Sequence, residues 1–424
     1  MTYSVQSMNA SHSLRPSVGC RALAFAATVV LGGGAATRVA HAQWTVTNLH
    51  PPGATESKAL AASDGRQVGY VAVGGQQHAS IWNGSPTFWI DLNPPEALSS
   101  VANAICGTRQ SGQVVANGSA HASAWTGTAS SWIDLNPSGS TGSAAYGVSG
   151  TQQVGSTRFD VFPRASLWSG TAGSWVDLQP IGSSMSVAIA ASETQQVGYT
   201  GGFGWSMPLA HAVLWSGTAA SWIDLHPVGF GVFRSAALAI GDGQQGGFVQ
   251  IGDPTHQYWG LATIWSGTAA SWVLLHPGGD FYGSSQVSAV SRGFQAGYTY
   301  SDTEDGSRAA FWHGSSSSWV DLHAILPTGF TSSVATGLSS DATTLYVSGY
   351  GFNTLTSRNE ALLWTRPICC PADFNCSTHL EVQDIFDFLS AWFALDPRAD
   401  FNAVNGITTQ DIFDFLAAWF AGCS

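Results

Sequence analysis

Charged residues are scarce in this sequence, and basic ones most of all. Only 9% of the 424 residues are charged, with 14 arginines and lysines against 26 aspartates and glutamates, so the formal net charge is −12. An ordinary soluble domain has about 25% charged residues. A protein that follows the phosphates of a nucleic acid needs a basic surface, so this composition excludes nucleic acid as a partner.

Long apolar runs and catalytic motifs are missing as well. The apolar run at residues 22–31 is shorter than the roughly 20 residues that a membrane-spanning helix needs, and no later segment approaches that length. The sequence holds no Gly-x-Ser-x-Gly elbow, His-Glu-x-x-His motif, phosphate-binding loop or dinucleotide-binding fingerprint. We therefore expect no transmembrane segment, no catalytic residues and no enzymatic activity.

The N-terminus has the pattern of an export signal. Arg15 and Arg21 precede the apolar run, and the small residues after it end in Ala-His-Ala before Gln43, a typical cleavage pattern. We expect residues 1–42 to be a signal peptide and the mature bacterial protein to be secreted, extracellular or associated with the cell surface. Cysteines outside the cytosol favour disulfides over thiolate chemistry. Cys106 stands alone in a strand-like run, where we expect a small buried apolar residue.

A repeat with a spacing of 43 to 52 residues runs through most of the chain. Each unit carries four short strand-like runs, such as Gln196–Tyr199, His211–Trp215, Ser221–Leu225 and Ser235–Ile240. Four short strands in 40 to 50 residues are typical of one β-propeller blade. The first tryptophans of the seven units are Trp82, Trp125, Trp168, Trp215, Trp265, Trp312 and Trp364. We predict an all-β, seven-bladed propeller over residues 43–367.

The seventh unit lacks a strand that the other six have. A Trp-x-Asp-Leu strand follows each of the first six units but not Trp364, and a related segment, Val46–Pro51, stands before the first unit. If this segment completes the seventh blade, the ring closes without a free sheet edge. An open solenoid would instead leave an orphan strand at each end. We predict a ring that is closed by the N-terminal strand.

The order of these runs resembles the kelch blade, and the His-Ala-x-Leu-Trp and Gln-Val-Gly-Tyr elements resemble the bacterial extracellular HAF repeats over residues 44–366. Some blades depart from the pattern. The position of His78, His121 and His211 is occupied in other blades by Arg164, Arg308 and Glu360. The position of the recurring aspartates (Asp91, Asp134, Asp177, Asp224 and Asp321) is occupied in the fifth blade by Leu274. Copying from blade to blade indicates structural roles for these residues. The paired tryptophans are expected to fill the wedge between sheets, with sugar stacking as the alternative.

The repeats differ most after their second strands, at residues 200–210, 249–260, 299–308 and 351–360. Strands alternate in direction, so these variable loops share one face of the ring. Exposed aromatic and polar residues there fit a glycan or protein ligand, and packing within the loops is the alternative. The residues concerned are Trp205, Asp253, His256, Tyr258, Trp259, Asp302, Glu304 and Asp305.

Two related segments, 27 residues apart, follow Pro371. Each begins with oxygen-bearing residues at the spacing of an EF-hand calcium loop and continues into one amphipathic helix. The candidate calcium ligands are Asp373, Asn375, Ser377, His379, Glu381 and Asp384 in the first loop, and Asp400, Asn402, Gly406, Thr408 and Asp411 in the second. Val404 offers no side-chain oxygen, so we expect calcium mainly in the first loop. The alternative is a helical pair held by its aromatic core and disulfides without metal.

This tandem resembles a dockerin, a pair of F-hands. The Cys370-Pro-Ala-Asp start and the Ala421-Gly-Cys423 end are similar to the GC-type dockerins, and the resemblance covers residues 369–424. It implies calcium binding and a cohesin-like or envelope anchoring partner for a small helical domain at residues 368–424. Because Cys369 and Cys370 precede the first loop and Cys423 follows the second helix, we expect Cys423 to be bonded to one of them.

Together these patterns predict a secreted, non-enzymatic binding or display propeller that a dockerin-like domain attaches to a surface or complex. The alternative is an extracellular hydrolase or lyase of polysaccharides with its site in the channel of the ring.

Overall fold

The computed structural model describes residues 44–422 except 117, 202–209, 230, 253–259, 278–282, 302–305, 342, 369, 376, 378, 397–398 and 403–405. The expected signal peptide lies outside the described residues. The chain divides after Ile368 into two compact units, one built of strands and one of helices. Among the described residues, no helix has the length and apolar character that crossing a membrane would require.

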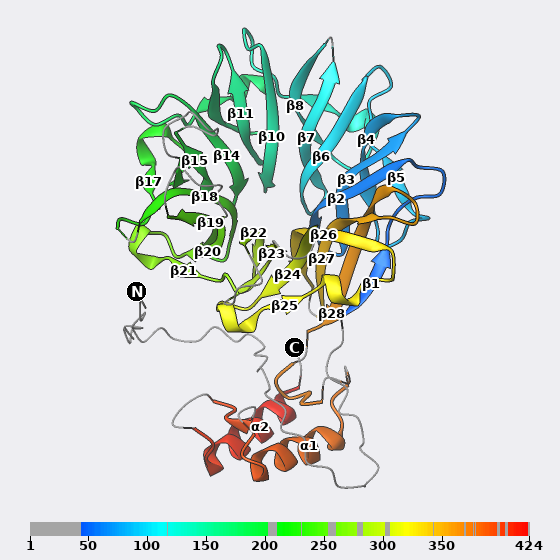
Figure 1. Ribbon diagram of the computed structural model, residues 1–424, viewed down its shortest axis with the longest axis vertical. Coiled ribbons are helices and arrows are strands. Elements are labelled where there is room, and N and C mark those ends of the chain that lie inside the picture. Colours follow the sequence, from blue (N-terminus) through cyan, green and yellow to red (C-terminus); the bar gives the residue numbers. More distant parts are fainter. Residues whose placement is uncertain are drawn as a thin grey trace. The chain divides into compact units, whose positions relative to one another are not determined.

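Seven four-stranded sheets form a ring in the first unit, so the predicted seven-bladed propeller is confirmed (Figure 1). Blades 1 and 2 consist of β2 (Glu56–Ser63), β3 (Arg66–Val73), β4 (Gln76–Trp82) and β5 (Trp89–Asp91), and of β6 (Ser99–Cys106), β7 (Arg109–Ala116), β8 (Ser119–Trp125) and β9 (Ile133–Asp134). Blades 3 and 4 consist of β10 (Gly142–Ser149), β11 (Gln152–Arg158), β12 (Pro163–Trp168) and β13 (Val176–Asp177), and of β14 (Ser186–Ala191), β15 (Gln196–Thr200), β16 (His211–Trp215) and β17 (Ile223–Asp224).

The remaining blades continue this order. Blades 5 and 6 consist of β18 (Val232–Gly241), β19 (Gln244–Ile251), β20 (Leu261–Trp265) and β21 (Val273–Leu274), and of β22 (Ser284–Ser291), β23 (Phe294–Ser301), β24 (Gly306–Trp312) and β25 (Val320–Asp321). Blade 7 consists of β26 (Phe330–Ser340), β27 (Thr344–Asn353), β28 (Arg358–Pro367) and the N-terminal strand β1 (Thr45–Asn48).

The N-terminal strand closes the ring, as the count of strands predicts. β1 pairs antiparallel with β28, from Thr45 opposite Thr365 to Asn48 opposite Leu362. The pairing continues one residue further, where the backbone N–H of Leu49 donates to the carbonyl oxygen of Ala361 at 2.8 Å. Every blade therefore has four strands.

The first tryptophan of each unit fills the wedge between two blades, as predicted. All seven are at most 1% exposed. Trp125 of blade 2, for example, packs in one cluster with Ile81 and Leu92 of blade 1. The second tryptophans fill the wedge only in part. Five of them are partly buried and pack against clusters between blades: Trp89, Trp132, Trp175, Trp272 and Trp319. Trp222 departs from the prediction, because it is 39% exposed.

The outermost strands are also shorter than expected. In blade 4 the strand is Ile223–Asp224 rather than Ser221–Leu225, because Ala219–Ser221 form a 3-10 turn. The hydroxyl of Ser221 holds this turn by donating to the carbonyl oxygen of Thr218 at 2.7 Å and accepting the backbone N–H of Ser216 at 2.8 Å. The constant Ser-Gly-Thr-Ala-Ala-Ser segment therefore encodes a capped turn.

A β-bulge lies at the same place in the first strand of every blade. In blade 4 the register shifts between Ala188 and Ala190, and Gly198 of the second strand pairs with Ala188. A Cβ on Gly198 would lie 1.9 Å from the carbonyl oxygen of Val187. The bulge strengthens the local twist and brings this carbonyl toward the second strand, which is why the Gln-Val-Gly-Tyr pattern contains glycine.

The second unit contains two helices, α1 (Val382–Phe393) and α2 (Thr409–Ala421). Their core is a stack of Phe388 on Phe415, with ring centroids 4.1 Å apart and an angle of 3° between the planes. The indole N–H of Trp392 donates to the carbonyl oxygen of Thr408, at the start of α2, at 2.9 Å. Trp419 makes the equivalent bond to Glu381, at the start of α1, at 3.2 Å. These reciprocal contacts show that the end of each helix lies beside the start of the other.

Candidate functional site

The recurring histidines and aspartates hold the fourth strand of a blade to its third. In blade 1, Nδ1 of His78 lies 2.7 Å from Oδ2 of Asp91, and Oδ1 of Asp91 accepts the backbone N–H of Asn93 at 2.7 Å. Both carboxylate oxygens are thus engaged within the blade. The equivalent pairs at this position are His121–Asp134, Arg164–Asp177, His211–Asp224 and Arg308–Asp321.

Two blades replace both members of this pair at once. In blade 7 the acid stands on the third strand, where Oε2 of Glu360 accepts a hydrogen bond from Nδ2 of Asn48 at 2.7 Å. In blade 5 both positions are apolar, and Leu261 and Leu274 pack in one hydrophobic cluster. The departures from the repeat are therefore matched substitutions within a structural pair.

A buried serine on each first strand joins neighbouring blades. Oγ of Ser100 accepts the backbone N–H of Ala79 at 2.9 Å and donates to Oδ1 of Asn93 at 2.6 Å. The equivalent acceptors of a backbone N–H at the other six blade interfaces are Ser57, Ser143, Ser186, Ser235, Ser285 and Ser333. The polar residues copied from blade to blade thus stabilise the ring, and a binding site must use residues that differ.

Most of the variable loops expected to carry such a site lie outside the described residues, together with all eight residues singled out there: Trp205, Asp253, His256, Tyr258, Trp259, Asp302, Glu304 and Asp305. The loop predicted at residues 351–360 is described and is mostly strand, with only a short turn between β27 and β28. It holds Glu360 in a dense set of hydrogen bonds.

Glu360 is 2% exposed. Its carboxylate accepts hydrogen bonds from four side chains, those of Asn48, Asn353, Thr356 and Arg358. Burial by itself raises the pKa of Glu360, but these donors together outweigh it and lower the pKa to about 2. The carboxylate is therefore charged at neutral pH and ties the closing strand to blade 7.

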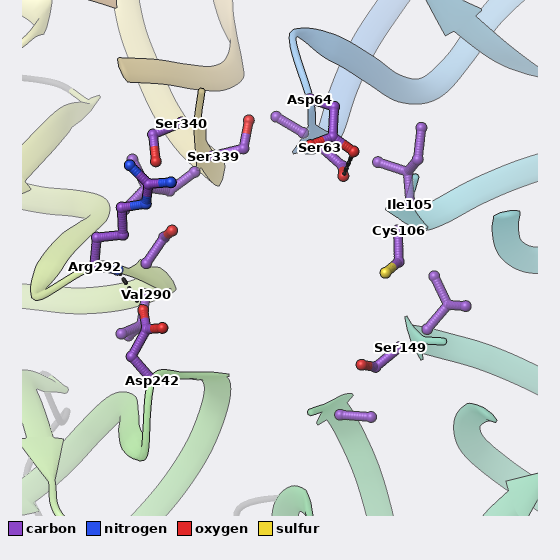
Figure 2. A pocket seen from close by; sticks show the side chains of 15 residues that line it. Ser63, Asp64, Ile105, Cys106, Ser149, Asp242, Val290, Arg292, Ser339 and Ser340 are labelled. Carbon is purple, nitrogen blue, oxygen red and sulfur yellow. Dashed lines mark hydrogen bonds between the residues drawn. The ribbon is translucent and has the colours of Figure 1, made fainter. Parts of the chain in front are cut away.

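A cavity lies at one mouth of the central channel of the propeller. It has a volume of about 320 Å³ and is lined by residues of all seven blades (Figure 2). They come from the ends of the first strands and from the two-residue turns that follow. We call this cavity the channel mouth. It lies on the face opposite the loops between second and third strands, because successive strands run in opposite directions.

Three charged residues at the channel mouth occupy the first position of such turns. Asp64, Asp242 and Arg292 have φ values of 49°, 52° and 50°, each is followed by glycine, and each is exposed. Two-residue hairpin turns require positive φ, which Asp-Gly supplies at little cost. Oδ2 of Asp242 accepts the backbone N–H of Arg292 at 2.5 Å, which links blades 5 and 6.

From the sequence we expect a site in the channel only for the alternative, enzymatic function, and none of the residues at the channel mouth is predicted to form it. One feature of the sequence could have indicated the channel mouth. The first residue of the turn after the first strand keeps a positive φ in five blades, but its residue type varies: Asp64, Gly107, Gly150, Asp242 and Arg292. Cys106 also belongs here. It is a free thiol that is turned toward the opening (Figure 2) and is only partly buried, so the expected burial of a small apolar residue is reached only in part.

In the helical unit, two predicted calcium ligands stabilise the starts of the helices. Asp384 and Asp411 are fully buried. Oδ2 of Asp384 accepts the backbone N–H of Glu381 at 2.9 Å, and Oδ2 of Asp411 accepts that of Thr408 at 2.7 Å. Burial raises the pKa of Asp411, but hydrogen bonds from Thr408 and Asn402 outweigh this and lower it. The two segments thus have the same hydrogen bond between an aspartate and the backbone at the start of the helix.

The other predicted ligands are less uniform. Oδ1 of Asp373 accepts the backbone N–H of Ser377 at 2.8 Å, as does Oδ1 of Asn375 at 2.9 Å. His379 and Glu381 are exposed, and Gly406 has a φ of 73°. In the second loop, Oδ1 of Asp400 is buried without a hydrogen-bond partner in the described part of the chain. The described residues contain no group of three histidine, cysteine or acidic side chains placed to hold a metal ion.

Both helices expose large apolar side chains at positions that the 27-residue repeat relates. Phe386 and Phe393 of α1 are 59% and 76% exposed, and Phe413 and Phe420 of α2 are 66% and 78% exposed. We call these four residues the phenylalanine faces. Each face lies on the side of its helix away from the stacked Phe388 and Phe415 core. Phe393 and Phe420 touch Trp392 and Trp419 edge-on, with ring centroids 5.2 Å apart, and still leave most of their own surface exposed.

Cys370 takes part in a disulfide. Cys369, Cys376 and Cys423 lie outside the described residues, so the pairing of Cys423 with Cys369 or Cys370 stays a prediction.

No family model matches this chain, and no curated protein matches it. Among solved structures it is similar to the β-propeller domain of the trilobed protease from Pyrococcus furiosus, with 10% identity and a TM-score of 0.47 over 74% of this chain and 96% of that one. It is also similar to the Pyrococcus horikoshii acylaminoacyl peptidase, with 12% identity and a TM-score of 0.45 over 76% of this chain and 54% of that one. The chain thus spans about half the length of that peptidase.

Proposed function

We propose that this protein is a secreted, non-enzymatic propeller that its C-terminal unit, acting as a dockerin-like module, attaches to a cohesin-like or envelope protein. The observation that carries this proposal is the pair of phenylalanine faces, Phe386 with Phe393 and Phe413 with Phe420. Large apolar side chains gathered on the exposed surface of rigid helices are typical of protein docking sites, where aromatic anchors contribute most of the binding energy.

The charge of the unit narrows the kind of partner. Residues 369–424 include eight acidic residues and a single basic one, Arg398. Charged residues at the edge of an interface speed association and select the partner when the two proteins carry charges of opposite sign. We therefore propose a receptor surface with an apolar centre, which receives the phenylalanines, and a basic rim.

Calcium fits the loops before the two helices. It prefers six to eight oxygen ligands, mostly carboxylates and carbonyls. The buried Oδ1 atom of Asp400, which has no partner among the described residues, supports a cation there, as do the fully buried carboxylates of Asp384 and Asp411. When bound, calcium would neutralise these carboxylates and hold each loop against its helix. We propose that the first-loop ligands are Asp373, Asn375, Ser377, His379, Glu381 and Asp384, and that those of the second loop are Asp400, Asn402, Gly406, Thr408 and Asp411.

In this proposal the propeller is the displayed part. Its repeated polar residues are used in holding strands and blades together, as Asp91 and Ser100 are, which supports a binding role without catalysis. The face of the variable loops is where we propose a glycan or protein ligand.

The test uses the mature full-length chain and the envelope fraction of the producing organism. The double variant Phe386→Asp with Phe413→Asp places charge on both phenylalanine faces, and we expect it to lose saturable binding to that fraction. Ile181→Asp is the matched control, because Ile181 is 97% exposed on the propeller. We expect it to bind like the unchanged protein.

Equal binding of the double variant and the unchanged protein would overturn the anchoring role. The same preparations are incubated with polysaccharides and assayed for released sugars. Product release that survives purification would overturn the non-enzymatic assignment and favour a polysaccharide hydrolase or lyase.

A further inference from the structure

The channel mouth contains polar groups that the protein itself leaves unsatisfied. Ser339 is 9% exposed, and its hydroxyl oxygen is buried with no hydrogen-bond partner among the described residues. The hydroxyl of the next residue, Ser340, is in the same state. Both residues line the cavity. A buried hydroxyl without a partner is costly, so either serine would be stabilised by a ligand that forms a hydrogen bond with it.

Carboxylates at the rim keep acceptors free as well. Oδ2 of Asp64 accepts the hydroxyl of Ser63 at 3.0 Å, and Oδ2 of Asp242 accepts the backbone N–H of Arg292. The second oxygen of each carboxylate has no partner in the described part of the molecule. Nη1 of Arg292 donates to the carbonyl oxygen of Asp341 at 3.2 Å, which holds the guanidinium at the rim with its remaining N–H groups available.

These groups favour a neutral ligand that both donates and accepts hydrogen bonds. Asp64 and Asp242 stand apart across the opening (Figure 2), so they do not converge on one cation. Their negative charge disfavours an anion. Apolar side chains such as Ile105, Val148 and Leu338 line the same cavity and can contact C–H groups. A volume of about 320 Å³ is near the lower end for ligand pockets, which suits a molecule of monosaccharide size.

We propose that the channel mouth binds a small neutral polyhydroxylated compound, either a free sugar or the terminal unit of a saccharide chain. Asp242 accepts hydrogen bonds from its hydroxyl groups, Arg292 donates to its oxygens, and Ser339 gains the partner that it lacks. This site is separate from the variable-loop face and does not depend on the anchoring role.

Cys106 provides the measurement, because its free thiol lines the channel mouth. The mature full-length protein is alkylated with N-ethylmaleimide, and mass spectrometry of the Cys106 peptide gives the rate. Glucose, galactose, xylose and arabinose are tested as protecting ligands, each beside its short oligosaccharides to distinguish the two sources. Putrescine and acetate test a cation and an anion. We expect one sugar or its oligosaccharide to slow alkylation saturably, and the two charged compounds to have no effect.

Two variants separate binding from folding. Ser339→Ala removes a hydroxyl that has no partner among the described residues, so the melting temperature should stay the same or rise while sugar protection weakens about tenfold. Asp242→Asn keeps the turn, since asparagine tolerates positive φ, and should weaken protection by a similar factor. Ser111→Ala is the matched control, because the Ser111 hydroxyl is equally buried and unpartnered but lies outside the cavity.

The proposal is overturned if no sugar protects Cys106, if putrescine or acetate protects it as well as the sugars do, or if Ser339→Ala and Asp242→Asn are protected like the unchanged protein.

Discussion

The glycine of the second strand leaves no room for a side chain in any blade. A Cβ at Gly69, for instance, would lie 1.9 Å from the carbonyl oxygen of Lys58, and Gly349 would meet that of Val334 at 2.0 Å. The obstacle is backbone held in a bulge, which cannot yield as the end of a flexible side chain does. The glycine is therefore required by packing rather than by its own dihedral angles.

We predict that Gly198→Ala destabilises the propeller by about 2 kcal/mol or more, since it forces the bulged strand away from its neighbour. Gly173→Ala is the control. No atom lies within 4 Å of a Cβ at Gly173, and the equivalent residue of the next blade is Ala220. We expect it to be neutral. Urea unfolding of both variants checks this, and equal stability would contradict the steric account.

Glu360 makes the pairing of the N-terminal strand β1 with blade 7 sensitive to acid. Its pKa lies at about 2 in the folded protein, below the usual value of about 4.3. Because the pKa is lower in the folded state, the charged carboxylate stabilises the fold at pH values above the pKa of the unfolded state. This stabilisation is lost as the pH falls through the pKa of the folded state.

We predict that Glu360→Gln lowers the free energy of unfolding by about 1–3 kcal/mol at neutral pH, the range for hydrogen bonds to a charged group. The difference from the unchanged protein should shrink as the pH falls from about 4.5 toward 2. Urea unfolding across this range measures it, with Glu96→Gln, at an exposed position, as the control. A difference that stays constant with pH would refute the assigned role.

At the scale of the strand pair, residues on the third and fourth strands change together. Blade 4 has His211 with Asp224, and blade 5 has Leu261 with Leu274. A half-buried polar pair and an apolar pair each satisfy the same contact, but a mixed pair leaves a carboxylate against a leucine.

We predict that Leu274→Asp alone destabilises blade 5 by about 1–3 kcal/mol. The double variant Leu261→His with Leu274→Asp should recover part of this loss, with a coupling energy of about 1 kcal/mol. Thermal unfolding of the two single variants and the double variant completes the cycle. Additive effects would mean that the two positions do not act as a pair.

The two helical segments allow a matched comparison of calcium binding. Because Val404 offers no side-chain oxygen where the first loop has Ser377, water must replace a ligand in the second loop. We predict one dominant calcium site by titration calorimetry of the mature chain, abolished by Asp373→Ala and only mildly weakened by Asp400→Ala. The reverse order of effects would assign the dominant site to the second loop.

At the scale of the whole propeller, stability depends on a contact between residues at opposite ends of the ring sequence. Asn48 and Glu360 are 312 residues apart and share a hydrogen bond. The β1–β28 pairing covers the last free edge of blade 7, which would otherwise be a template for aggregation.

We predict that deletion of residues 43–51 from the mature protein lowers the melting temperature by about 10 °C or more, or abolishes cooperative melting and causes aggregation. Calorimetry and light scattering measure these outcomes. The less severe variant Asn48→Ala should fall between the deletion and the unchanged protein. Unchanged melting of the deletion variant would contradict closure by this strand.

The number of blades and their closure could be predicted because the signals are local and repeated. A buried tryptophan such as Trp215 and the strand residues around it recur in each unit, and the missing strand after Trp364 has its counterpart at Val46. The contacts between neighbouring blades are repeated for the same reason, since Ser100 and its equivalents recur at one position of each unit. The matched exception at Leu261 and Leu274 was visible only as a lone departure at Leu274, because the pairing of the two positions depends on strand register.

The channel mouth emerged only from the three-dimensional arrangement. Asp64, Asp242, Arg292 and Ser339 stand in four different blades and have no common sequence motif. Closing the ring brings them together at one opening, and the packing around Ser339 leaves its hydroxyl without a partner. Repetition along the chain was enough to predict how each blade is built, because a blade is made from neighbouring residues. The chemistry of the mouth depends on side chains whose distances are set by the closed ring.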